Sequence, residues 1–450
     1  MKIAENEKRQ KVLSKFDILN LVIGSIIGWG SFVLPGKSFL PNSGVLNTAI
    51  GLGIGGVFVI VIQRAYKVML GKNVGEGGEF SYTLDNLGRV QGFIVGWSLI
   101  LCYLSMIPLN ATAYVVISRK IFGNALLWGY LYSIGGYQVF FTDVVIASIP
   151  IIIFTWINAR GISLSSMVQN IMIMSLVIIV TALFFVILAK SDLAYFKKNY
   201  LNISEFSFSK IAPVIAIIPF LFVGFDVVPQ VSENLEFKPS KAHLITVLSI
   251  VAGIMIYNLL NIIAALSYSP SDLKSVEWAV GSSVIAKTGK LGFIFLLVAL
   301  LAAVTGGING FMLSSTKLLG AVSHKNLCPQ MFSACNKKGV YINALFFICA
   351  VSLIGPWIGR NVIILIVDMA SVLAAIAYSY VGFIGIKKAD KKTDKFLCFV
   401  SLIIGLTFIG LLLIPGSPAQ LSISSMLFLI AWSLLGFVFY VFTTRKKNIL

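Results

Sequence analysis

Long, uninterrupted runs of apolar residues dominate this sequence. Runs such as 171–189 and 244–266 have about the 20 residues that a helix needs to cross a hydrocarbon core of roughly 30 Å. In lipid, every backbone N–H and C=O must find a partner within the protein, so only helices and closed barrels span a membrane. Barrel strands alternate in polarity over about ten residues, whereas these runs are continuous. The sequence therefore predicts an all-α integral membrane protein.

Composition supports the same conclusion. Of the 450 residues, 58% are hydrophobic and 12% are charged, whereas soluble domains average about 25% charged residues. A chain this poor in charge cannot cover a soluble surface, so its partner is the lipid bilayer. We expect twelve transmembrane helices, near residues 16–36, 43–69, 90–118, 141–158, 163–189, 211–235, 242–268, 288–322, 341–358, 361–386, 396–414 and 421–442.

The distribution of positive charge predicts the orientation of the chain. There are 35 Lys and Arg residues and a net charge of +18, and most of these residues fall on one side if the N-terminus is inside. This bias is the positive-inside pattern of membrane proteins, so both termini are expected in the cytoplasm. It can also attract anionic lipid, and it argues against nucleic acid as a partner. The expected location is the cell inner (cytoplasmic) membrane of a bacterium, as a multi-pass protein.

Residues that commonly form metal or catalytic sites are sparse. The five cysteines form no C-x-x-C pair, and three of them fall in predicted spans, where cysteine acts as a small hydrophobe. The two histidines, His243 and His324, lie near predicted helix ends and cannot make a metal cluster between them. We therefore expect no enzyme, no catalytic residue and no resident cofactor.

The first predicted span contains a cluster of glycines at Gly24, Gly28 and Gly30. Glycine is a poor helix former, so this helix is expected to unwind near mid-membrane. Unwinding exposes N–H groups at the start of the following half-helix, and these favour an anion such as a carboxylate. The alternative is close helix packing through Gly24-x-x-x-Gly28.

The sixth predicted span contains a second irregularity. Pro219 and Pro229 bracket Gly224 and Asp226 inside an apolar run, and each proline removes a backbone donor. An aspartate at bilayer depth costs at least about 2.5 kcal/mol unless it faces a cavity or a partner, which marks Asp226 as a functional candidate. Alternatively, Asp226 caps a half-helix or pairs with another helix.

The two irregular spans occupy corresponding positions, because each begins one of two halves of opposite orientation. Paired broken segments in inverted repeats point to the central site of a transporter. The expected parts are a cytoplasmic tail, a first repeat, an extracellular loop, a second repeat, two further helices and a second cytoplasmic tail. In that order, they cover residues 1–15, 16–189, 190–210, 211–386, 387–442 and 443–450.

Several fragments resemble motifs of the amino acid–polyamine–organocation (APC) family of transporters, in particular its cationic-amino-acid-type branch. The resemblance covers nearly the whole chain, and the fragments follow one another in the family's order and spacing. They are residues 28–35, 75–82 with 92–97, 158–161, 222–226 with Glu233, and 316–317 with 326–329.

This resemblance implies a LeuT-type fold, with a five-plus-five inverted repeat, broken helices 1 and 6, and two more helices at the C-terminus. It also implies alternating access around a central site. Amides around Ser25, Gly28 and Gly30 would hold a substrate carboxylate. The other implied roles are carbonyls near Phe222, Gly224 and Phe225 for the amine, Phe225 as a lid, and Glu233 in the cytoplasmic gate.

Two departures from the family pattern bear on substrate and coupling ion. Trp29 stands where many members have a small residue, so its indole would narrow the pocket or stack on an amine. Ser163 stands where several members carry a lysine whose ammonium replaces a sodium ion. Without that lysine the chain either binds sodium or exchanges substrates with no coupling ion, and hydroxyls on membrane helices more often bond to their own backbone. The candidate sodium ligands are Gly24, Ile27, Ser314 and Ser315.

We expect a secondary active transporter, a symporter or exchanger, of an amino acid or related small organic amine. Asp226 would supply negative charge for a cationic amine or a titrating site. Asp368, inside the tenth predicted span, would occupy a gating or proton-carrying position. The alternative is a membrane-embedded ligand-binding receptor or partner subunit that does not translocate its ligand. Substrate identity, coupling ion (sodium, proton or none) and oligomeric state stay open at this point.

Overall fold

The computed structural model describes residues 12–72, 75–202 and 205–445. The predictions for residues 1–11, 203–204 and 446–450 lie outside the described residues. The described chain is almost entirely helical, as expected. Nine of its segments are long and apolar enough to cross a membrane, and Ile342–Ile358 is a shorter apolar helix. The nine are Trp29–Lys72, Arg89–Leu126, Phe141–Ala159, Ile162–Ala189, Pro239–Ala265, Ala279–His324, Arg360–Lys388, Lys392–Leu413 and Ile423–Thr443.

The first predicted span is interrupted at its glycine cluster. Helix α1 (Lys15–Ile26) ends there, and Ile27 and Gly28 adopt extended backbone conformations. Helix α2 (Trp29–Leu34) then begins, with no side chain capping its first amides. The break expected from the low helix propensity of glycine is therefore present.

The sixth predicted span is divided into short helical pieces. A Cβ added at Gly224 would lie 2.5 Å from Cβ of Ser25 and 2.8 Å from its carbonyl carbon. Gly224 also has a φ of +117°, which favours glycine. The two interruptions therefore touch each other, and glycine is what lets them approach. The pieces are α9 (Phe208–Ala216), α10 (Ile218–Leu221), η4 (Phe225–Val227) and η5 (Pro229–Asn234).

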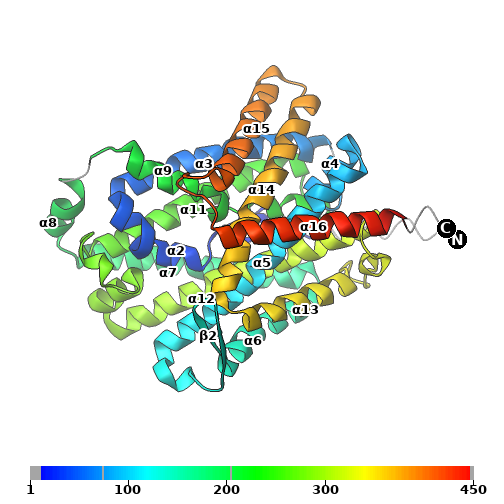
Figure 1. The fold of residues 1–450 in the computed structure, drawn as a ribbon. Coiled ribbons are helices and arrows are strands. Elements are labelled where there is room, and N and C mark those ends of the chain that lie inside the picture. The colour runs from blue at the N-terminus through cyan, green and yellow to red at the C-terminus, as the bar shows by residue number, and fades with distance from the viewer. Residues whose placement is uncertain (1–11, 73–74, 203–204, 446–450) are drawn as a thin grey trace.

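Three long helices form the centre of the molecule. They are α5 (Arg89–Phe122), α12 (Ala279–His324) and α14 (Arg360–Lys388), the most deeply buried of the nine segments. Figure 1 shows them crossing in the middle of the bundle. α12 starts before the predicted span 288–322, because a kink at Gly289 joins it to a preceding helix.

The other elements surround this centre, and a short hairpin lies at one end of the bundle. Strands β1 (Tyr130–Ile134) and β2 (Tyr137–Phe140) pair antiparallel around Gly135 and Gly136, which both have positive φ. We call this the hairpin end, and we call the end that carries α4 (Glu79–Leu87) and η8 (Gln330–Ser333) the loop end. The remaining elements are η1 (Pro35–Phe39), α3 (Leu40–Lys72), α4 (Glu79–Leu87), η2 (Gly123–Leu126), α6 (Phe141–Ala159), α7 (Ile162–Ala189), α8 (Leu193–Phe196), η3 (Lys197–Leu201), η6 (Pro239–Lys241), α11 (Ala242–Ala265), η7 (Asp272–Lys274), η8 (Gln330–Ser333), α13 (Ile342–Ile358), α15 (Lys392–Leu413) and α16 (Ile423–Arg445).

The outer helices present apolar side chains away from the core. On α16, Ile423, Leu427, Leu434 and Phe437 are all exposed. Exposed apolar surface of this extent needs a cover, and the continuous hydrophobicity of these helices fits lipid. The core of the molecule therefore lies at the centre of the bundle, between α5, α12 and α14.

Candidate functional site

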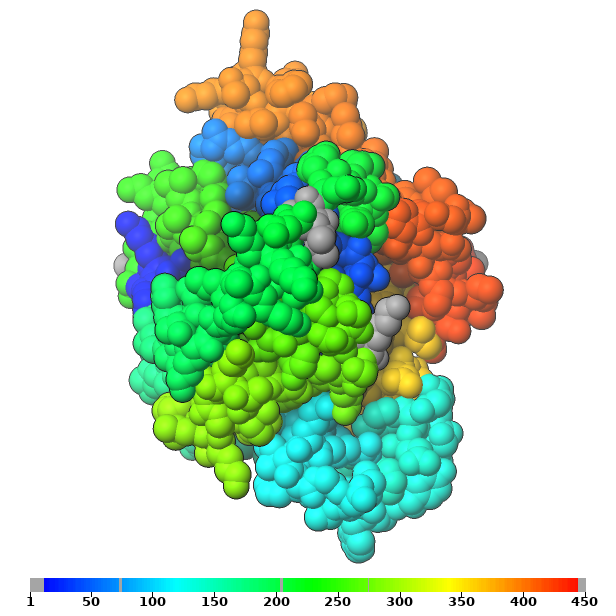
Figure 2. Space-filling view, turned by 90° about the vertical axis from the view of Figure 1, so that its left-hand side faces the viewer, coloured from blue at the N-terminus to red at the C-terminus, as the bar shows by residue number. Residues whose placement is uncertain are grey.

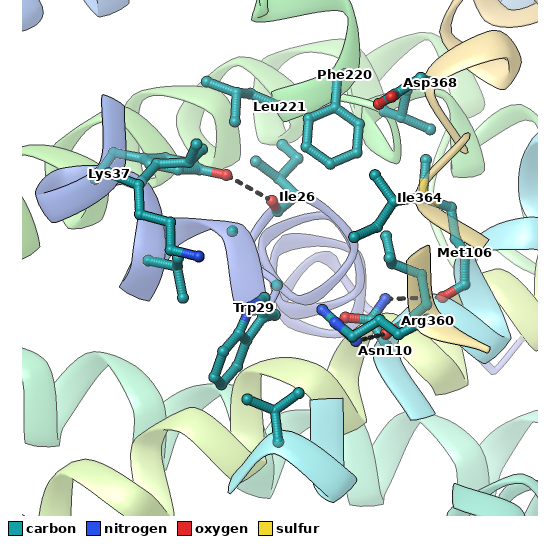
Figure 3. A pocket seen from close by; sticks show the side chains of 18 of the residues that line it. Ile26, Trp29, Lys37, Met106, Asn110, Phe220, Leu221, Arg360, Ile364 and Asp368 are labelled. Atoms are coloured by element: carbon teal, nitrogen blue, oxygen red, sulfur yellow. Dashed lines mark hydrogen bonds between the residues drawn. The ribbon is translucent and has the colours of Figure 1, made fainter. Parts of the chain in front are cut away.

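A cavity of about 460 Å³ lies where the two interrupted spans meet. The first span contributes Gly28 and Trp29 to its wall, and the sixth span contributes Leu221 and Val223. In Figure 3, Trp29 lies below and Leu221 above the same space, with side chains of α5 and α14 to the right. The cavity is thus built on the two segments that the sequence singled out.

The cavity opens toward the hairpin end. Lys37 and Asn361, which border it, are exposed. Lys120, at the end of α5, forms an ion pair with Glu277 at 2.7 Å, and the hydrogen bond and charge of Lys120 lower the pKa of Glu277. Figure 2 shows the segment around residue 280 (yellow-green) beside the hairpin region (cyan) at this end. This pair therefore bridges two sides of the cavity mouth.

Two tryptophans form part of the wall near the mouth. The rings of Trp29 and Trp278 stack, with centroids 6.3 Å apart. Trp278 Nε1 donates a hydrogen bond to the carbonyl of Phe32 at 2.9 Å, which ties the segment before α12 to α2. The Trp29 indole occupies the wall; that it narrows the pocket or stacks on an amine stays a prediction.

Arg360, in the first turn of α14, also borders the cavity, and sequence reasoning missed it. The residue is buried, with 7% of its surface exposed. Its Nη1 donates to the Leu109 carbonyl at 2.9 Å and to Thr112 Oγ1 at 2.7 Å. Its guanidinium carbon lies 5.6 Å from the centre of the Trp29 ring, within cation–π range. In the sequence, position 360 falls in a short gap between two predicted spans, where arginine is typical of an ordinary surface loop.

One face of α14 follows the cavity. Arg360, Ile364 and Asp368 recur at a spacing of four residues, and all three border the space. Figure 3 shows Asp368 and Arg360 toward opposite ends of this face, with Ile364 between them and Phe220 nearby. The structure therefore places Asp368, a predicted gating residue, on the cavity wall.

The predicted residues of the first span lie at the cavity. Ser25, Gly28, Trp29 and Gly30 all border it, and the Ser25 hydroxyl donates to a carbonyl of its own helix at 2.8 Å. The Asn110 side chain, which the sequence analysis did not single out, lies 3.0 Å from where a Cβ at Gly28 would be. An isolated asparagine in a long apolar span carries no signal of this contact.

The predicted residues of the sixth span lie behind the cavity rather than on its wall. Phe222, Gly224 and Phe225 are buried and do not border the space. The Phe225 ring packs against Tyr378 and Tyr66, with centroid distances of 4.9 Å and 5.7 Å. The lid role of Phe225 stays a prediction, and it would require this packing to change.

Asp226 is buried and is hydrogen-bonded at the interruption. One carboxylate oxygen accepts from the Gly224 amide at 2.8 Å, and the other accepts from the Tyr103 hydroxyl at 3.0 Å. Asp226 thus caps the interrupted backbone and joins it to α5. These contacts match the alternative in which Asp226 caps a half-helix and pairs with another helix.

The cavity is closed toward the loop end. The Leu13 amide donates to the Asn234 carbonyl at 3.0 Å, and the Glu236 amide donates to the Leu13 carbonyl at 3.0 Å. Lys317 Nζ donates to Asn234 Oδ1 at 2.9 Å. Glu233, the predicted gate residue, is half-buried in η5 among these contacts. The segment before α1 therefore pairs with the end of the sixth span.

The residues proposed for a coupling ion are only partly brought together. Gly24 and Ile27 are buried at the end of α1, whereas Ser163 is exposed at the first turn of α7, so Ser163 does not join them. Ser314 and Ser315 donate to carbonyls one turn back in their own helix, at 2.9 Å and 2.6 Å. This backbone bonding is the alternative to sodium coordination.

A buried network of uncharged side chains lies beside Gly24. Asn309 Oδ1 accepts from Asn158 Nδ2 and from Ser165 Oγ, both at 2.9 Å. Asn309 Nδ2 donates to Gln169 Oε1 at 2.9 Å, and the Gln169 side chain lies against Gly24. This network links α6, α7 and α12 to α1. Sequence reasoning missed it because its members come from three separate spans.

Comparison with known proteins gives a consistent result. A family model described as amino acid permease matches residues 13–447. The branched-chain amino acid permease of Bacillus subtilis (strain 168) is 24% identical over 452 residues, which cover 98% of this chain and 94% of that protein. The methylthioribose transporter of the same organism is 24% identical, covering 73% of this chain and 71% of that protein. The human large neutral amino acids transporter small subunit 2 is 23% identical, covering 83% and 67% respectively.

Proposed function

The chain belongs to the amino acid permease family, and on that premise we propose that it carries an amino acid or related small organic amine across the membrane by alternating access. The observation that carries this proposal is the cavity itself. It borders the interruptions of the first and sixth spans, opens at the hairpin end and is closed at the loop end. A binding site reached from one side at a time is what alternating access requires.

We also propose twelve membrane spans arranged as two inverted repeats. α1 with α2 would form the first span, the pieces α9 to η5 the sixth, and Ile342–Ile358 the ninth. The nine long apolar segments would supply the other nine spans, with only α3 (Leu40–Lys72) of the segment Trp29–Lys72 counted as the second span. The repeats would cover 16–189 and 211–386, followed by two helices within 387–442. The positive-inside bias supports a cytoplasmic loop end and an outward-facing hairpin end in a cell inner membrane.

The cavity supports an assignment for the substrate's polar ends. Its carboxylate would lie at the amides of Gly28 and Gly30, and its amine near the carbonyls around Phe222 and Phe225 once that segment moves. The names of the relatives refer to branched-chain amino acids, large neutral amino acids and methylthioribose. They support a substrate of amino-acid size for this chain.

For coupling, we favour substrate exchange or proton coupling over sodium. The hydroxyls of Ser314 and Ser315 are engaged with their own helix. Beside Gly24, the Gln169 side chain brings an amide whose N–H groups are donors, and donors do not coordinate a cation. Asp226 and Asp368 are the candidate proton-carrying groups.

A thermal-shift screen of the purified full-length chain tests the substrate class. Amino acids, polyamines and small amines would each be added with sodium or with potassium, at two pH values. A ligand at 100 times its Kd stabilises the folded state by about 2.7 kcal/mol, so an amino acid should raise the melting temperature, equally in sodium and potassium. If every amine leaves the curve unmoved while another solute class shifts it, the proposal is wrong. If a ligand stabilises the protein only in sodium, the coupling assignment is wrong, but the proposed substrate class still stands.

A further inference from the structure

We propose that Arg360 binds an anionic group on the side chain of the substrate, so that the preferred substrates are amino acids with a side-chain carboxylate. This inference rests on the proposed function of the cavity. It starts from a buried cation on the cavity wall. In the described part of the chain, no carboxylate lies within ion-pair distance of Arg360.

The surroundings of Arg360 orient its charge without neutralising it. An arginine side chain stays protonated in proteins, and a buried charge is costly unless an opposite charge compensates it. The Leu109 carbonyl, the Thr112 hydroxyl and the Trp29 ring are all uncharged partners. They fix the position of the guanidinium but do not neutralise its positive charge, which leaves a bound ligand to supply the opposite charge.

The free edge of the guanidinium fits a carboxylate. Within the described residues, Arg360 donates its two hydrogen bonds from Nη1, and its Nε and Nη2 have no hydrogen-bond partner. These two nitrogens form one edge of the planar fork, which donates two parallel hydrogen bonds to the two oxygens of a carboxylate. Figure 3 shows Arg360 beside Asn110 at the border of the space that Trp29 also faces.

The charge of the cavity wall favours a substrate with a net negative charge. Its cationic side chains are Lys37, Lys120 and Arg360, and its carboxylates are Glu277 and Asp368. Lys120 and Glu277 pair with each other at the mouth. Asp368 lies about 12 Å further along the α14 axis from Arg360. The wall therefore keeps an excess positive charge, which a monoanionic amino acid balances and a neutral zwitterion does not.

Glutamate and glutamine are the matched probes for this inference. They have nearly the same size and share the α-amino and α-carboxylate groups, so they differ only in the side-chain carboxylate. A group that binds the α-carboxylate would affect both alike, whereas a group that binds the side-chain carboxylate affects glutamate alone. The comparison thus separates Arg360 from the amides of Gly28 and Gly30.

The experiment measures uptake of labelled glutamate and labelled glutamine by proteoliposomes containing the full chain. The unmodified protein should prefer glutamate by at least about ten-fold, because hydrogen bonds to charged groups have that strength. Arg360→Gln should lower glutamate uptake by about 10–100-fold and change glutamine uptake by less than about three-fold. Arg89→Gln makes the same substitution at an exposed arginine that does not border the cavity, and it should keep the preference for glutamate. Arg360→Lys keeps the charge but loses the fork, and should be intermediate for glutamate.

The outcomes separate this inference from the proposed function. A native protein that transports neutral amino acids but does not prefer glutamate overturns the inference and leaves the proposed function intact. If Arg360→Gln and Arg360→Lys both lower glutamate uptake and glutamine uptake equally, the inference is also overturned, because Arg360 would then act on the fold or on the α-carboxylate. If no amino acid is transported at all, the proposed function fails.

Discussion

At the scale of single residues, Asp226 illustrates how a membrane-embedded carboxylate can serve the backbone. Its two oxygens accept hydrogen bonds from the Gly224 amide and from the Tyr103 hydroxyl. The first bond satisfies an amide that the interrupted helix leaves free, and the second ties the interruption to α5. If the sixth span moves relative to α5, the hydrogen bond between Asp226 and Tyr103 must therefore break, or Tyr103 must move with Asp226.

Asp226→Asn tests this role. The amide keeps the shape but replaces one acceptor oxygen with a donor, so one hydrogen bond to a charged group is lost, worth about 1.5–3 kcal/mol. We expect amino acid uptake into proteoliposomes to fall by at least about ten-fold, while size-exclusion chromatography shows a folded protein. As a control, Asp390→Asn makes the same change in an exposed ion pair with Lys72. Uptake by this variant should stay within about two-fold of the native rate. Native kinetics in Asp226→Asn would remove Asp226 from the mechanism.

At the scale of elements, the decisive contact is that between the two interruptions. Gly224 approaches the Ser25 backbone so closely that no side chain fits between them. Ser25 also borders the cavity, so this contact sets the distance between the two segments that form the site. A rigid contact between otherwise irregular segments keeps the site defined.

Gly224→Ala should separate these segments. The methyl group adds a collision with Ser25 to the strain of a positive φ, and together these cost more than about 3 kcal/mol. Gly289→Ala is the matched control, because Gly289 also has a positive φ but has no atom within 4 Å of an added Cβ, so only the strain of about 1–3 kcal/mol applies. We expect Gly224→Ala to lower the melting temperature more than Gly289→Ala does. Only Gly224→Ala should also abolish uptake. Equal effects of the two substitutions would contradict the importance of the contact.

Some features of these elements could be predicted from the sequence, and others could not. The interruptions were predictable because glycine and proline act locally on the backbone. The β1–β2 hairpin carries a local signal in Gly135-Gly136, a turn pair between aromatic residues, which the assignment of helical spans overlooked. By contrast, the contacts of Arg360 and Gln169 join residues from distant spans. No local pattern encodes such contacts, so they required the structure.

At the scale of the whole molecule, the two ends differ. The cavity reaches the surface at the hairpin end, between exposed Lys37 and Asn361. At the loop end, the segment around Leu13 pairs with Asn234 and Glu236 below the cavity. The molecule therefore adopts a state open to one side, which the proposed orientation makes the outside.

Cysteine accessibility tests this state and its orientation. Ile364→Cys places a thiol on the cavity wall, whereas Ser232→Cys places one in the closed segment, where 2% of the residue is exposed. A membrane-impermeant thiol reagent added outside intact cells should label Ile364→Cys, more slowly with excess substrate, and should spare Ser232→Cys. Native Cys335 is exposed at the loop end and should react only in inverted vesicles. Labelling of Cys335 from outside would reverse the proposed orientation.

Counterflow tests the central claim, that this chain carries an amino acid by alternating access. Proteoliposomes would be preloaded with the amino acid that most stabilises the protein, then diluted into a trace of the same labelled compound. A carrier that works by alternating access should accumulate label transiently above its outside concentration. Protein-free vesicles and vesicles with Gly224→Ala should show no such accumulation. A ligand that stabilises the protein yet never accumulates would contradict transport by alternating access and favour a membrane-embedded receptor.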